Sequence, residues 1–428
     1  MEESKRWRYA TLAAVALWIG LAVRLMVADV WDETNGMLAF SSDAMSLGQK
    51  LQFVLTQSLG FWRPLPTLFV TVVLHFVRDF DVSWRVLRVV NIVLLLAAAR
   101  VLVGAVARRS DGTDGTDGTY GTYGTYRTYR TAAGPAGFIF TLAFLFSGSA
   151  IITAGWYANV FDASALLLIA VAMSLLLRGR DLAAGVVLGV AFFCKETAAL
   201  GLPFLLILFA AGRITFRQAL RSGIPAAILG AIYFVLRSKI VPFGSTGDVH
   251  GFDPAQLVPT LVNLSESFWR QTLKGDGPGI FGFVFLVLSL AALVRPRLIA
   301  AAVAFLLATA VIYWGMFGIH QGGVLMHHLN FAGRLYLVPV ALMLFLLALE
   351  RRTFVIAILL LPILFGAATT WYDHSRFQQT YAQIYKLAPV VVHYPTKPLD
   401  DTVRKVKVGE FPDAPVRVDA KDGKLVHR

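Results

Sequence analysis

Charged residues are scarce in this chain. Asp, Glu, Lys and Arg make up 15% of its 428 residues, whereas an average soluble domain carries about 25%. Hydrophobic residues make up 57%, and the mean hydropathy is +0.65. A soluble core would not need apolar runs of about 20 residues at regular intervals. The composition therefore predicts an all-α, polytopic membrane protein.

Cysteine is nearly absent as well. Cys194 is the only cysteine and lies inside an apolar run. No intrachain disulfide can therefore form, and cysteine usage does not indicate whether the protein faces an oxidising or a reducing compartment. Positive charge, by contrast, is in excess, with a formal net charge of +13. In a membrane protein such an excess indicates topology and a preference for anionic lipid. Because no basic aromatic platform or nucleic-acid motif accompanies it, we expect membrane lipid as a partner and no nucleic acid.

The apolar runs predict about eleven transmembrane helices within residues 1–372. They lie at about 9–27, 86–106, 134–152, 160–177, 182–196, 198–212, 222–238, 278–294, 298–317, 334–349 and 353–372. With the N-terminus inside and the C-terminus outside, the arginines of the connecting loops fall in the cytoplasm. The first run lacks a convincing cleavage site and is expected to be retained. Arg outnumbers Lys, which favours a bacterial cytoplasmic (inner) membrane.

The first outer loop, residues 28–85, is predicted to contain two juxtamembrane helices. Residues 47–59 read as an amphipathic helix, and 64–77 form an apolar stretch too short to cross a bilayer. Counting 64–77 as a span would move the arginine pairs of all later inner loops outside. We therefore expect this stretch to be interfacial or re-entrant.

Three further segments lie outside the predicted spans. Residues 110–131 repeat Gly, Thr and Tyr with no apolar face, which predicts a flexible cytoplasmic linker. Residues 239–278 form a second large outer loop. The polar tail, 373–428, is expected to be extracytoplasmic, either forming a small β element at stretches such as 403–408 and 416–418 or being partly disordered.

This topology gathers polar residues at one outer mouth. Ionisable groups in or beside membrane spans are costly and are usually functional. Cations can clamp a phosphate, and a carboxylate can take a proton from an attacking hydroxyl. The gathered residues are Asp32, Glu33, Arg63, Arg85, Arg88, Asn159, Asp162, Lys195, Glu196, Arg237, His320, His327, His328 and Arg334.

Simpler interpretations of these residues stay open. The acidic stretch at 29–35 can be a solvated loop. Arg85 and Arg88 can be snorkelling anchors at the start of a helix. Lys195 and Glu196 can be a neutralising ion pair, and the three outer histidines can be ordinary interfacial polar residues.

Four short motifs occur in order along the chain: VWDE at 30–33, FWRPL at 61–65, FFCKET at 192–197 and GRLYLVP at 333–339. With these motifs, residues 1–352 resemble the GT-C class of membrane glycosyltransferases. The similarity is closest to the TPR-containing O-mannosyltransferases and more distant to protein O-mannosyltransferases and aminoarabinose transferase. Enzymes of this class take a sugar from a polyprenyl or dolichyl phosphate.

The resemblance implies a role for individual residues. Asp32 corresponds to the general base and Glu33 to its acidic neighbour. The residues implied to bind the donor phosphate or line the cavity are Arg63, Arg88, Lys195 and Arg334. Those implied to contact the acceptor or the cavity are Asn91, Trp156, Asn159, Asp162, Glu196 and Tyr336. The chain departs from the class in lacking the Arg of the Trp-Ile-Ser-Gly-Arg motif, the preceding His-Pro and a TPR array.

The sequence thus predicts an inverting glycosyltransferase. A polyprenyl-phosphate-linked sugar is the donor, and a protein, lipid or glycan on the extracytoplasmic face is the acceptor. No cofactor is required; for a divalent cation, His320, His327 and His328 are the only nitrogen ligands at hand. A lipid-linked sugar flippase or transporter and a non-catalytic scaffold of the same fold stay open as alternatives. The chain lacks the internal repeat common in transporters.

Overall fold

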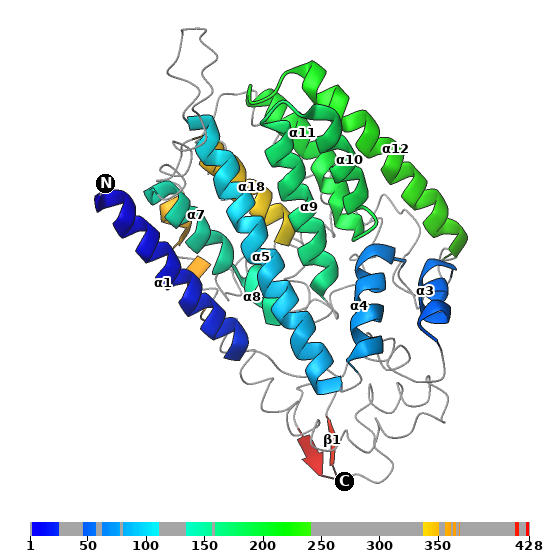
Figure 1. The fold of residues 1–428 in the computed structure, drawn as a ribbon. Coiled ribbons are helices and arrows are strands. Elements are labelled where there is room, and N and C mark those ends of the chain that lie inside the picture. Colours follow the sequence, from blue (N-terminus) through cyan, green and yellow to red (C-terminus); the bar gives the residue numbers. More distant parts are fainter. Residues whose placement is uncertain are drawn as a thin grey trace.

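The computed structural model describes residues 2–24, 46–56, 62–77, 80–110, 134–155, 159–240, 337–350, 356–360, 363–364, 368, 416–418 and 425–427. Within these ranges the chain is predominantly helical, and most of the helices run side by side (Figure 1). The helices are α1 (Glu2–Arg24), α3 (Leu47–Thr56), α4 (Pro64–Phe76), α5 (Phe80–Ser110), α7 (Pro135–Leu145), α8 (Gly148–Gly155), α9 (Val160–Leu176), α10 (Asp181–Ala191), the 3-10 helix η2 (Glu196–Leu200), α11 (Gly201–Ala210), α12 (Phe216–Ile240) and α18 (Leu337–Leu349).

Two helices are long and apolar enough to cross a bilayer, by the segments Arg85–Ala107 of α5 and Phe216–Ile240 of α12. A third span results if α7 and α8, which meet at 62°, form one broken crossing. These helices indicate a membrane protein. Helices also lie at each of the remaining predicted spans from 9–27 to 222–238, and at 334–349. The total of eleven and the orientation remain predictions; 278–294 and 298–317 lie outside the described residues, and 353–372 is described only in part.

Both helices predicted in the first outer loop are present. α4 spans 13 residues and begins with Pro64, whose fixed backbone angle suits the first turn of a helix. At about 1.5 Å per residue it extends about 20 Å, less than the hydrocarbon core. It packs against α3, α5 and α9. In the tail, β1 (Val416–Val418) pairs antiparallel with β2 (Leu425–His427), which confirms a β element at 416–418; residues 403–408 lie outside the described ranges.

Glycines end two helices at the same end of the bundle. Gly179 has φ +74° and Gly212 has φ +67°, a left-handed conformation that side chains disfavour. The amide of the residue after each glycine returns to a carbonyl of the last turn, from Arg180 to Leu175 at 3.0 Å and from Arg213 to Leu208 at 2.8 Å. These turns reverse the chain from α9 to α10 and from α11 to α12.

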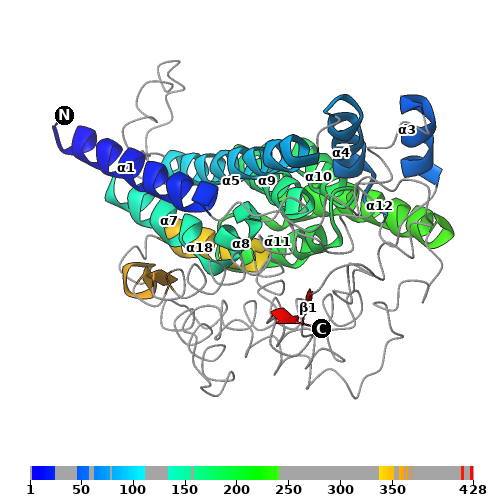
Figure 2. The same ribbon diagram turned by 90° about the horizontal axis from the view of Figure 1, so that it is seen from below.

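The central helices pack in the order α5, α9, α10 and α12, seen from below in Figure 2. α10 and α12 approach closely because α10 has small residues at the contact. A Cβ added to Gly185 would lie 2.3 Å from the carbonyl oxygen of Ser222, and one added to Gly189 would lie 2.6 Å from Leu229. This close packing fixes which side chains of α12 reach the far end of α10.

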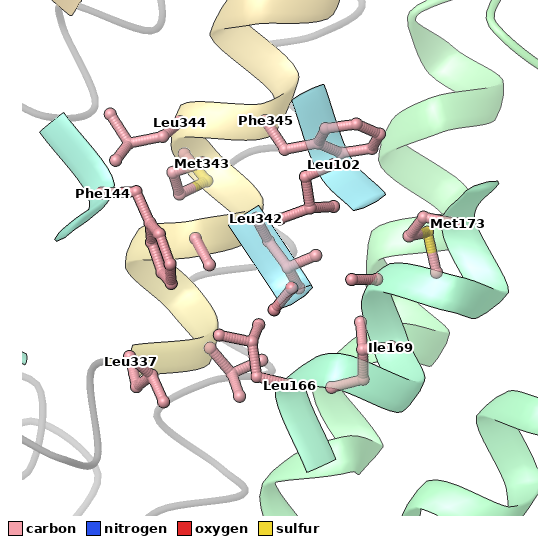
Figure 3. Close-up of a cluster of buried hydrophobic side chains, with 14 of the residues drawn as sticks. Leu102, Phe144, Leu166, Ile169, Met173, Leu337, Leu342, Met343, Leu344 and Phe345 are labelled. Carbon is pink, nitrogen blue, oxygen red and sulfur yellow. The ribbon is translucent and has the colours of Figure 1, made fainter. Parts of the chain in front are cut away.

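α18 closes the core. Nearly all of its residues are buried, from Leu337 to Leu349, as expected for a helix that is apolar on every face. It packs against α5, α7, α8 and α9. Figure 3 shows Leu342 and Phe345 of α18 among Leu102, Phe144 and Leu166 from those neighbours. α18 begins at Leu337, 97 residues after α12 ends at Ile240, and is thereby part of the same hydrophobic core as α12.

Candidate functional site

The site lies where the chain breaks between α10 and α11. Residues 192–194 form a turn, and Lys195 is extended at φ −164° and ψ 145° before η2 begins at Glu196. Both ionisable side chains are buried, with Lys195 1% and Glu196 2% exposed. A charge removed from water needs a partner in the low-dielectric interior. The surrounding elements supply such partners.

Glu196 is the centre of one cluster. Arg63 Nε donates to its Oε2 at 3.1 Å, and Arg237 Nε lies 3.4 Å from its Oε1. The Tyr233 hydroxyl lies 2.9 Å from Oε1 and 2.9 Å from the carbonyl oxygen of Trp62, so its proton can be donated to either. Tyr233 and Arg237 are one turn apart on α12. Three separate chain segments therefore meet at one carboxylate.

Lys195 belongs to a second cluster beside the first. Its Nζ donates to Asp162 Oδ2 at 2.5 Å, and both side chains are buried. Asp162 stands in the first turn of α9, next to Phe161, whose ring centroid lies 5.5 Å from Cζ of Arg63. A guanidinium over an aromatic face at this distance is attracted to it. The two clusters are thus joined through Phe161 and through the peptide bond between Lys195 and Glu196.

Arg88 and Asn91 lie one turn apart near the start of α5. Both are buried, and the Asn91 amide donates to the carbonyl oxygen of Thr153 at 3.2 Å. Leu87, beside Arg88, packs in one apolar cluster with Val160 of α9. The start of α5 therefore faces the start of α9, where Asn159 and Asp162 are also buried.

Buried cations and carboxylates are paired at this break. Arg63 and Arg237 are in ionic contact with Glu196, and Lys195 is in ionic contact with Asp162. Arginine and lysine side chains of this kind also suit phosphate oxygens.

Aromatic rings pack around Tyr233 on one side of the Glu196 cluster. Trp62 stacks on Tyr233 with centroids 5.7 Å apart, and Phe193 meets both rings edge-on at 6.1 and 5.4 Å. Phe192 and Phe234 also contact Tyr233. These apolar walls lower the local dielectric, which strengthens every ionic contact inside them.

The structure brings together part of the predicted site. Arg63, Asp162, Lys195 and Glu196 are linked as described, and each of Lys195 and Glu196 has a partner from another element. The snorkelling interpretation fits Arg85, which is exposed, and is wrong for Arg88, which is 2% exposed. The predicted residues outside the described ranges are Asp32, Glu33, Trp156, His320, His327, His328, Arg334 and Tyr336.

Sequence reasoning missed the part played by α12. The sequence predicts Arg237 at the outer mouth but assigns it no role, and it gives Tyr233 no place in the site. The available signal was a Tyr and an Arg four residues apart near the end of an apolar helix, a spacing that puts both on one face. Without knowledge of the α10–α12 contact, nothing in the sequence pairs them with Glu196.

No group of three or more His, Cys, Asp or Glu that could hold a metal ion occurs among the residues described here. Comparison of the chain with protein-family models, with curated proteins and with solved structures finds no match. The functional interpretation therefore rests on the residues of this chain and on their geometry.

Proposed function

We propose that this membrane protein is a glycosyltransferase that moves a sugar from a polyprenyl-phosphate donor to an acceptor hydroxyl on the extracytoplasmic face. The main support is the set of buried cations, Arg63, Lys195 and Arg237, that gathers at the break between α10 and α11. Cations held by carboxylates inside a membrane protein are costly to bury. A lipid-linked phosphate is a substrate that would use them.

In the proposed reaction, Asp32 takes the proton from the acceptor hydroxyl, with Glu33 as its acidic neighbour. The acceptor oxygen then forms a bond to the anomeric carbon from the side opposite the phosphate. The bond between that carbon and the phosphate oxygen breaks, and its electron pair leaves with the polyprenyl phosphate. The anomeric configuration is therefore inverted.

The leaving phosphate gains negative charge, which preorganised cations stabilise. We assign this role to Arg88, Lys195 and Arg334. Asp162 holds Lys195 in place through its ion pair, while Glu196 holds Arg63. Because these contacts already position Lys195 and Arg63, those two cations need little rearrangement during the reaction.

Donor consumption tests the proposal. Membranes containing the protein and endogenous acceptors are supplied with a panel of radiolabelled polyprenyl-phosphate hexoses and pentoses. We expect Asp32→Asn, which removes the general base, and Lys195→Met, which removes a charge-stabilising group, each to lower sugar transfer by about a hundredfold or more. Lys239→Met, at an exposed position on α12, serves as the matched control and should transfer normally.

A second variant separates folding from chemistry. Asp162→Asn combined with Lys195→Met removes both charges of the buried pair, so the variant should fold better than Lys195→Met alone while remaining inactive. Full transfer by this double variant would disprove the role of Lys195. Movement of the donor across the bilayer without breakage of the sugar–phosphate bond would replace the proposal with a flippase.

A further inference from the structure

α12 carries an exposed stripe whose chemistry changes along its length. The stripe begins with Arg217 and Arg221, which are both exposed. Ile224 and Ile228 continue it, each 55% exposed, and Ile232 follows at 45%. These positions are three or four residues apart and therefore lie on one face of the helix. Since α12 lies at the edge of the described helix bundle (Figure 1) and qualifies as a membrane span, the stripe presents a basic end and an apolar length to the bilayer.

A second basic segment lies beside the start of α12. The turn between α9 and α10 carries Arg178 and Arg180, which are both exposed. Next to Arg180, the Asp181 carboxylate accepts a hydrogen bond from the side-chain amide of Gln218 at 3.3 Å. Because Gln218 directly follows Arg217, this bond holds the two basic segments next to each other.

Hydrogen bonds also fix the first turn of α12. The backbone amide of Gln218 donates to Thr215 Oγ1 at 3.2 Å, and that of Thr215 donates to Gln218 Oε1 at 2.9 Å. This reciprocal arrangement is a capping box. One turn further on, the backbone of Ser222 lies against Gly185 of α10. Arg217 and Arg221 therefore extend from a backbone that is already ordered, which lowers the entropic cost of holding a ligand.

The described carboxylates at this end of the bundle are already engaged. Asp181 is 9% exposed and bonded to Gln218, and Glu350 pairs with Arg213 at 2.7 Å. Within the described ranges, the arginines at this end that form no ion pair are Arg178, Arg180, Arg217 and Arg221. Each guanidinium has five N–H donors, and such donors bind phosphate oxygens strongly. The exposed surface here therefore suits an anionic partner.

This basic surface is far from the candidate functional site. Arg217 precedes Arg237, which contacts Glu196, by 20 residues on α12 (237 − 217). At about 1.5 Å per residue, the two positions are about 30 Å apart along the helix. The hydrocarbon core of a bilayer has about this thickness. The basic end of the stripe and the Glu196 cluster therefore lie at opposite surfaces of the membrane.

We infer that the start of α12 and the turn between α9 and α10 form a binding site for an anionic phospholipid. The lipid phosphate contacts the exposed arginines, and the acyl chains lie along Ile224 and Ile228. A phospholipid is favoured over a soluble anion because the basic end continues directly into the apolar stripe. The site is separate from the contacts assigned to the donor phosphate and does not depend on the proposed function.

Photo-crosslinking in lipid nanodiscs tests the inference. A photo-reactive amino acid is placed at Leu220, which is 44% exposed, or at Val93 of α5, a control position that is 57% exposed. The nanodiscs contain equal amounts of phosphatidylglycerol and phosphatidylcholine with identical acyl chains, and mass spectrometry identifies the captured lipid. We expect the captured ratio of phosphatidylglycerol to phosphatidylcholine to be at least about fivefold higher at Leu220, because each basic residue near an anionic bilayer surface contributes about that factor.

Substitutions then locate the headgroup. Arg217→Gln combined with Arg221→Gln should lower the captured ratio at Leu220 to that of the control position on α5. The matched control, Arg6→Gln combined with Arg8→Gln, removes the same charge from exposed positions on α1 and should leave the ratio unchanged. Lysine at 217 and 221 should preserve most of the enrichment, since the charge is kept.

A salt titration decides the matter if the double glutamine variant fails to fold. With every arginine in place, raising the ionic strength from about 0.01 M to about 1 M shortens the Debye length from about 30 Å to about 3 Å, and the enrichment should disappear. Equal ratios at Leu220 and Val93, enrichment that survives the double glutamine substitution, or enrichment that survives high salt would each overturn the inference. Loss of enrichment on adding inorganic phosphate at constant ionic strength would show a free-anion site and overturn the lipid assignment.

Discussion

Removing the charge of Glu196 should destabilise the fold strongly. Its carboxylate contacts Arg63 at 3.1 Å, Arg237 at 3.4 Å and the Tyr233 hydroxyl at 2.9 Å. In Glu196→Gln the amide keeps the shape, but two buried guanidinium groups lose their shared anion. Losing one partner of a buried ion pair costs about 3–5 kcal/mol, which changes the unfolding equilibrium more than a hundredfold.

The assay is equilibrium unfolding in mixed detergent micelles, followed by circular dichroism. Glu350→Gln is the matched control, since Arg213 Nε pairs with Glu350 at 2.7 Å but the two side chains are 22% and 19% exposed. Solvent screening limits such a pair to about 0–1 kcal/mol. Equal losses of stability for the two variants would refute the conclusion that the Glu196 cluster is energetically special.

A double-mutant cycle sharpens the test. Arg237→Gln combined with Glu196→Gln removes one of the two uncompensated cations, so the double variant should be more stable than the sum of the single losses implies. Groups in direct contact typically couple by about 0.5–3 kcal/mol. Strict additivity would show that Arg237 does not interact with the carboxylate, despite its distance of 3.4 Å.

Further predictions follow from the same geometry. Tyr233→Phe removes the hydroxyl donor shared by the Trp62 carbonyl and Glu196, and should lower the free energy of unfolding by about 1–3 kcal/mol. Tyr9→Phe, at an exposed ring, should leave it unchanged. Equal effects of the two variants would argue against the buried hydroxyl contacts. Gly185→Ala should destabilise the protein because its Cβ would overlap the backbone of α12. Gly20→Ala in α1 is the control: its Cβ meets nothing within 4 Å, and it should gain up to about 1 kcal/mol in helix propensity. Thermal unfolding compares the two variants, and a stabilised Gly185→Ala would contradict the close approach of α10 and α12. A thiol-reactive, membrane-impermeant label at a cysteine introduced within 111–131 should react only in inverted vesicles, and labelling in intact cells would disprove the predicted topology.

Charge scarcity and the spacing of apolar runs determined the helical membrane class, because burial in lipid requires every backbone group to bond within its own segment. Those runs located α9 closely, at 160–177 against Val160–Leu176, whereas α5 begins at Phe80 and α12 at Phe216, each six residues before the predicted span. Only the structure shows the backbone geometry of the turns after α9 and α11, where Gly179 and Gly212 have positive φ. The number of complete crossings stays a prediction, as several helices are shorter than a bilayer requires.

The sequence by itself also determined which polar residues are candidates for function, because an ionisable group inside an apolar membrane run is energetically costly and is usually functional. Only the tertiary structure decided their partners. Lys195 and Glu196 are neighbours in the chain, yet one pairs with Asp162 and the other with Arg63 and Arg237. Such pairings depend on how closely α10 approaches α12 and on where α4 begins, and these distances arise from packing between segments that local sequence patterns do not encode.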